Sequence, residues 1–167
     1  MWYNGLQHRV KVINSKEAGV LTTGELHPRQ KALLTFLAAG DEPVDPIRIQ
    51  KGMFIFAMEA PAQWGERYKF IPWHWGPFSV EIYSDLEALE RRGLVGSYPV
   101  PGCSWRRYSV TTEGSRLADQ LARYVPPDAL AYLKRVRQFV LELSFRRLLA
   151  AVYAKYPAYA VKSVFNY

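Results

Sequence analysis

The amino-acid sequence predicts a mainly helical α+β protein, in which three helices precede a two-stranded ribbon and further helices follow it. Two observations carry this prediction. In several segments apolar residues recur every three or four positions, which is the spacing of an amphipathic helix. Around residues 96–110, polar and apolar residues instead alternate on both sides of a turn, Pro101-Gly102-Cys103-Ser104, which is typical of a β-hairpin.

The composition bounds the class of protein. The chain has 167 residues, of which 49% are hydrophobic and 22% are charged, and these values are typical of a globular chain. No apolar run approaches the roughly 20 residues that cross a bilayer, and the first residues lack the pattern of a signal peptide. The single cysteine, Cys103, cannot form an internal disulfide. We therefore expect a cytoplasmic protein without membrane association.

Two helices are expected in the first half of the chain. The first begins after His27-Pro28 and ends at Gly40, which would be the left-handed residue that follows the C-cap. The second begins at Asp45-Pro46, with Asp45 as its N-cap, and runs to about Ala60. Ahead of them, residues 7–13 show a weak strand pattern, either as a lone strand or in a hairpin with the segment that follows.

The third helix is expected to begin at Gly76-Pro77, with the proline in its first turn, and to end before Gly93. The ribbon follows, and Thr111 or Thr112 is expected to cap the next helix. A long helix is then expected over about residues 129–153, and Ser144 could divide it in two.

The order of helix, helix, helix, ribbon and helix is that of a winged helix-turn-helix, in which the third helix is presented to DNA and the ribbon forms the wing. Residues 1–26 are accordingly expected to be an N-terminal extended segment, either a strand or a hairpin. Residues 27–125 would form the winged-helix domain, and residues 126–167 a C-terminal helical extension.

Two resemblances to known families point the same way. The run from Asp85 to Val95, followed by Tyr108-Ser109-Val110-Thr111-Thr112-Glu113-Gly114, resembles the MarR/PadR-type winged-helix regulators. The run Ile49–Phe56, followed by Trp75-Gly76-Pro77-Phe78-Ser79, resembles the YwgA-like and Panacea (SocA-like antitoxin) proteins, over about residues 29–121. The second resemblance implies a winged-helix-like fold and, in the Panacea case, binding to a protein toxin.

The charge distribution favours a polyanionic partner. Residues 1–90 hold 9 Lys/Arg against 11 Asp/Glu, whereas residues 91–167 hold 13 Lys/Arg against 4 Asp/Glu. A cationic second half suits double-stranded DNA, so we predict a DNA-binding transcriptional regulator. The side chains expected to contact DNA are Ser79, Arg91, Arg92, Trp105, Arg106, Arg107, Lys134, Arg135 and Arg137.

An alternative function is a protein-interaction module, such as an antitoxin or a subunit of a defence or CRISPR-linked complex. The exposed side of the third helix is expected to carry Glu81, Asp85 and Glu87, whose carboxylates would repel phosphate at close range. The apolar side of the C-terminal helices could also join two copies of the chain, and a homodimer would match a palindromic DNA site.

Chemistry-bearing motifs are scarce. His8, His27 and His74 are scattered, and no glycine-rich phosphate loop or Ser/His/Asp pattern occurs, so neither a metal, a cofactor nor an enzymatic activity is expected. His74 lies between Trp73 and Trp75. Such a cluster could stack on a base or a ligand, although aromatic clusters more often pack into a core.

Overall fold

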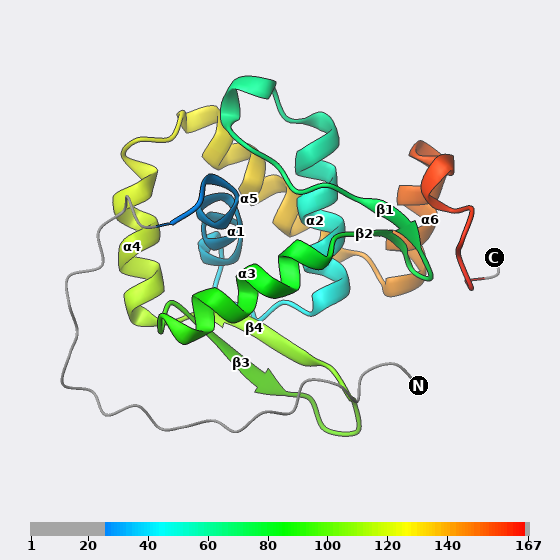
Figure 1. Cartoon of the computed structure of the whole chain (residues 1–167), viewed down its shortest axis with the longest axis horizontal. Coiled ribbons are helices and arrows are strands. Elements are labelled where there is room, and N and C mark those ends of the chain that lie inside the picture. The colour runs from blue at the N-terminus through cyan, green and yellow to red at the C-terminus, as the bar shows by residue number, and fades with distance from the viewer. Residues whose placement is uncertain (1–25, 166–167) are drawn as a thin grey trace.

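The structure, a computed structural model, describes residues 26–165 (Figure 1). These residues form a mainly helical α+β fold with two antiparallel two-stranded sheets, so the predicted fold class is confirmed at this level. The predicted strand at residues 7–13 lies outside the described residues. The main elements are α1 (Pro28–Ala38), α2 (Pro46–Glu59), β1 (Ile71–Trp73), β2 (Gly76–Phe78), α3 (Val80–Arg91), β3 (Val95–Pro99), β4 (Arg106–Val110), α4 (Thr112–Ala122), α5 (Pro127–Glu142) and α6 (Phe145–Lys155).

Several predicted helix ends are confirmed. The Asp45 carboxylate accepts a hydrogen bond from the Arg48 backbone N–H (3.0 Å), and the Thr111 hydroxyl accepts one from the Gly114 N–H (3.0 Å). Gly93 has a positive φ of 69°, as the residue after the end of α3 requires.

The prediction for Gly40 is wrong in its reason. Gly40 is not among the glycines with positive φ, and α1 ends with Ala39 as its C-cap. A Cβ atom at Gly40 would instead lie 2.3 Å from Nη1 of Arg137. A side chain at this position would have to displace the Arg137 guanidinium, so glycine here leaves room for Arg137 and is not required by the backbone conformation.

The segment at Gly76-Pro77 does not start a helix, contrary to the sequence prediction. Gly76 and Pro77 belong to β2, which pairs with β1 around the two-residue loop His74-Trp75. Gly76 has a φ of 84°, which no helical residue adopts. Helix α3 begins only at Val80. The proline pattern was misleading because a proline also fits a short strand in which its missing N–H is not required.

The expected long C-terminal helix is two helices. Leu143 has an extended conformation at the end of α5, and the Ser144 hydroxyl accepts from the Arg147 N–H (3.4 Å) at the start of α6. The division at Ser144 is thus confirmed. No helix in residues 26–165 is long and apolar enough to cross a membrane.

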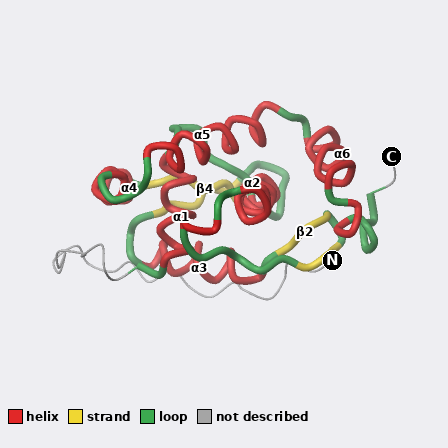
Figure 2. Tube along the Cα trace, turned by 90° about the horizontal axis from the view of Figure 1, so that it is seen from above, coloured by secondary structure: helices red, strands yellow, loops and turns green. Residues whose placement is uncertain are grey.

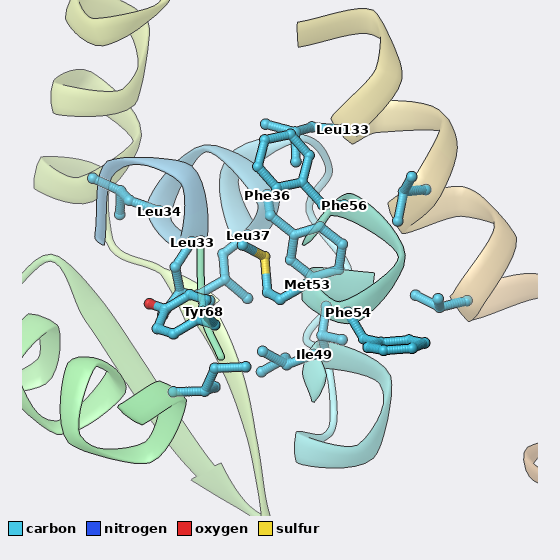
Figure 3. Close-up of a cluster of buried hydrophobic side chains, with 14 of the residues drawn as sticks. Leu33, Leu34, Phe36, Leu37, Ile49, Met53, Phe54, Phe56, Tyr68 and Leu133 are labelled. Atoms are coloured by element: carbon cyan, nitrogen blue, oxygen red, sulfur yellow. The ribbon is translucent and has the colours of Figure 1, made fainter. Parts of the chain in front are cut away.

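The core lies around α1 and α2. Figure 3 shows side chains of both helices packed together with Leu133 of α5. Leu133, Val136 and Val140 are all buried, so the apolar side of α5 belongs to this core. It is therefore not free to form the homodimer contact that was expected from the C-terminal helices. Figure 2 shows α3 and α5 on opposite sides of the layer that contains α1 and α2.

Candidate nucleic-acid interface

Helix α3 is held to α1 by a buried carboxylate. Asp85 is only 4% exposed and accepts hydrogen bonds from Arg29 Nε (2.8 Å), Gln30 Nε2 (2.8 Å) and the Tyr68 hydroxyl (2.9 Å). Arg29 also contacts Glu81 at 2.8 Å. The expectation that Asp85 is exposed is therefore wrong, and two of the three carboxylates expected on the outer face of α3 are paired with Arg29.

The same network changes the acid–base behaviour of its members. The hydrogen bond to Asp85 raises the pKa of Arg29 above its ordinary value, despite the opposing effect of burial. Burial and the neighbouring Asp85 carboxylate raise the pKa of the Tyr68 hydroxyl far above its usual range. Both groups therefore keep their protons at neutral pH, so the donors that hold α3 in place are permanent.

The N-terminal end of α3 is held by α2. The Gln50 side chain accepts from the Ser79 N–H (2.9 Å) and donates to the Ser79 carbonyl (2.8 Å), while Lys51 Nζ donates to the Pro77 carbonyl (3.1 Å). The two segments that carry the Panacea-like resemblance thus contact each other. Ser79 is only 2% exposed, so its predicted contact with DNA is excluded in this conformation.

Lys51 is an unusual member of this junction because its ammonium group is enclosed. Burial lowers the pKa of Lys51 to about 7, and the Asp45 carboxylate acts only weakly in the opposite direction. The Lys51 amine donates to a single carbonyl, that of Pro77, so we interpret it as a group that joins α2 to β2 and not as a chemically active one.

The exposed face of α3 carries few charged side chains that are not already paired. Val80, Ser84, Glu87 and Arg91 are exposed at spacings of four, three and four residues, so they lie in one row. Arg91 Nη1 contacts Glu87 at 2.8 Å, and both side chains are largely exposed. Arg91 can exchange this weak surface pair for a phosphate, because such pairs contribute little to stability. Arg92, the C-cap residue, is half-buried.

The β3–β4 ribbon follows the end of α3 and carries two exposed cations. Arg106 Nε donates to the Ser97 hydroxyl across the ribbon (2.8 Å), and the Arg107 guanidinium lies 5.9 Å from the centre of the Trp105 ring. Trp105 itself is half-buried. Five of the predicted contact residues therefore lie at the end of α3 or on the ribbon: Arg91, Arg92, Trp105, Arg106 and Arg107.

The three predicted contact residues of α5 are not part of this surface. Lys134 and Arg135 are exposed on α5, which lies across the molecule from α3 (Figure 2). Arg137 is buried and donates to the carbonyls of Gly40 and Glu42, and burial lowers its pKa. The prediction that Arg137 contacts DNA is wrong, because its charge is used to join α5 to the end of α1.

Sequence reasoning missed the residues that position α3. Asp85 lies three residues after Ile82 and four before Leu89, so its spacing places it on the buried face of the helix. No protein-family model matches the chain, and no curated protein matches it. The function is therefore inferred from these contacts and charges.

Proposed function

We propose that residues 27–125 form a winged helix-turn-helix and that the protein is a transcriptional regulator that binds double-stranded DNA through α3 and the β3–β4 ribbon. One observation carries the proposal. Val44, between α1 and α2, exchanges two backbone hydrogen bonds with Tyr108 of β4, at 2.8 and 2.9 Å. This bridge supports the proposal because, in a winged helix, a short strand between the first two helices pairs with the ribbon that follows the third helix.

The rigidity of α3 supports a role in groove recognition. A recognition helix must be held so that a few exposed side chains meet the DNA in a fixed register. Asp85 fixes the middle of α3 to α1, and Gln50 fixes its beginning to α2. The pairing of Glu81 and Asp85 with Arg29 also removes part of the repulsion that these carboxylates would exert on phosphate.

The cations of the ribbon support a phosphate contact. Arg106 and Arg107 are exposed and follow each other on β4, so alternation places their side chains on opposite faces of the ribbon. A ribbon that carries a cation on each face can follow the DNA backbone beside the groove that α3 enters.

Salt-dependent binding of duplex DNA tests this proposal. Fluorescence anisotropy would follow a labelled duplex from upstream of the protein's own gene across a range of salt concentrations. Each phosphate contact contributes about 0.9 to the slope of log K against log salt, so Arg106→Gln with Arg107→Gln is expected to lower the slope by about 2. Lys134→Gln with Arg135→Gln removes the same charge from the far side of the molecule and is expected to leave the slope nearly unchanged. Absence of binding at low salt, or an equal effect of the two double variants, would refute the proposal.

A second candidate function is a protein-interaction module, such as an antitoxin or a subunit of a defence complex. The observation that favours it is the row on α3, where Val80 is 65% exposed and the only cation, Arg91, is paired with Glu87. An apolar residue beside a neutral ion pair suits a protein surface better than phosphate. Purification from the native host would then yield one stoichiometric protein partner, and Val80→Asp would abolish the complex while duplex binding stayed absent.

A further inference from the structure

The β1–β2 hairpin and the chain that follows α6 form one end of the molecule (Figure 1). At this end the Val164 N–H donates to the His74 carbonyl (3.0 Å) and so fastens the C-terminal segment to the hairpin loop. Trp73 and Trp75, on either side of His74, are each 42% exposed. Two exposed tryptophans this close together form an apolar patch, and such patches mark binding sites more often than single exposed residues do.

The two exposed rings Trp73 and His74 begin a row of aromatic side chains that continues through half-buried Phe78 and Tyr83. The His74 ring stacks on Trp73, with centroids 4.8 Å apart and planes at 16°. Phe78 lies next to Trp73 at 6.3 Å, and Tyr83 of α3 lies next to Phe78 at 5.9 Å. The row therefore runs from the hairpin loop to the first turns of α3, and its exposed end, Trp73 with His74, is where a flat ligand could stack.

The two chain segments that form this end carry charge of one sign, and Glu81 in the first turn of α3 is paired with Arg29. Residues 67–80 and 143–165 contain six Lys/Arg and no Asp or Glu. Lys155 is paired with Glu59, and Arg67 donates to backbone carbonyls. The other four cations are exposed and form no ion pair with any residue that the structure describes: Lys69, Arg146, Arg147 and Lys162.

Two of these cations lie over aromatic rings. Lys162 Nζ is 5.9 Å from the centre of the Trp73 ring. The Arg146 guanidinium is 5.8 Å from the centre of Phe165, which reaches Trp75 through edge contacts with Phe145. Each exposed tryptophan of the hairpin is thus connected to a cation, which provides both a stacking surface and a contact for an anion.

A ligand that offers flat rings and regularly spaced anions fits this combination. Single-stranded nucleic acid presents both, because its bases are free to stack on aromatic side chains and its backbone carries one phosphate per nucleotide. Duplex DNA keeps its base faces inside the stack and cannot use the row in this way. Neither of the two segments contributes a carboxylate that would repel a phosphate backbone.

We propose that this end of the molecule binds single-stranded nucleic acid, with a base stacked on the Trp73–His74 pair and phosphates held by Lys162 and Arg146. The contact goes beyond the duplex contact of α3 and the ribbon and uses different residues. A protein that binds both would hold a duplex at the ribbon and an unpaired strand beside the first turn of α3.

Anisotropy titrations of the full chain test the proposal, with labelled oligothymidylate and oligouridylate of about 15 nucleotides, a length that exceeds common single-strand site sizes. The two probes separate DNA from RNA as the source of the strand. Trp73→Ala is expected to weaken binding of the preferred probe by about tenfold, the usual effect of losing one stacked base, and Trp73→Phe to restore most of it. Trp105→Ala, on the ribbon, is the matched control and is expected to change this affinity less than twofold.

Lys162→Glu is a second variant that keeps the test independent of packing, because the side chain is exposed. It is expected to weaken binding and to reduce its salt dependence, whereas the Arg106→Gln and Arg107→Gln double variant should bind the oligonucleotides as the wild type does. The proposal is overturned if the wild type binds neither probe at low salt, or if Trp73→Ala and Trp105→Ala have equal effects. Loss of a protein partner in Trp73→Ala without oligonucleotide binding would overturn it in favour of a protein-docking surface.

Discussion

Replacing Asp85 by asparagine is expected to lower the free energy of unfolding by about 3 kcal/mol, because it breaks the charged junction between α1 and α3. The carboxylate accepts from Arg29 and Tyr68 through one oxygen and from Gln30 through the other. Asparagine supplies only one acceptor oxygen, and its amide group would face at least one of these donors.

The magnitude follows from the exposure of the partners. Breaking a fully buried ion pair costs about 3–5 kcal/mol, and a hydrogen bond to a charged group contributes about 1.5–3 kcal/mol. The Arg29 side chain is 23% exposed and keeps its contact with Glu81, so water and Glu81 recover part of the loss. The lower end of the range for a buried pair is therefore expected.

Urea titrations of the wild type and the variant, followed by circular dichroism, measure this effect. Glu81→Gln is the matched control, because it removes a more exposed carboxylate from the same network and is expected to cost less than about 1 kcal/mol. A loss below 1 kcal/mol for Asp85→Asn, or equal losses for the two variants, would show that Asp85 does not hold α3 in place.

Three further predictions concern other junctions. Lys51 has a pKa of about 7 in the folded state, so above pH 7 it releases a proton that the unfolded lysine keeps up to about pH 10. The free energy of unfolding should therefore rise between pH 7 and 9, by at most about 1.4 kcal/mol per pH unit. Urea titrations should show this rise, and Lys51→Met should remove it. Gly114→Ala places a Cβ atom 1.9 Å from the Leu94 carbonyl oxygen and is expected to cost more than about 2 kcal/mol in thermal melts, whereas Ser115→Ala should stay within about 0.5 kcal/mol. Glu59→Gln weakens bonds from Lys155, Tyr132 and Tyr156 at a partly exposed carboxylate, and urea titration should find a loss of about 1 kcal/mol.

The helix ends show what the sequence could predict. Asp45, Thr111 and Gly93 act within a few residues of themselves, by capping a helix or by adopting a positive φ, so their effect can be inferred from the local sequence. Gly76-Pro77 is also a local pattern, but a proline with a preceding glycine suits both a helix start and a hairpin. The choice depends on pairing with residues 71–73 and on the contact of Lys51 with the Pro77 carbonyl, neither of which the segment itself specifies.

The candidate site was predictable only where its residues are exposed. Arg106 and Arg107 follow from the ribbon pattern, and both are exposed on it. Asp85 and Arg137 occupy apolar positions of their helices, and we expected both at the surface because charged side chains are seldom buried. Their partners on α1 and on the chain that follows it are 55 to 97 residues away, and such separations cannot be recognised from periodicity.

The most direct test of the account is a map of backbone amide shifts in ¹⁵N-labelled protein as duplex DNA is added. If duplex DNA binds to α3 and the ribbon, the shifts will be concentrated in α3, especially at Arg91, and in the ribbon at Arg106 and Arg107, while α5 stays unaffected around Lys134 and Arg135. Shifts concentrated in α5, or none in α3 and the ribbon under conditions where the duplex is bound, would contradict it.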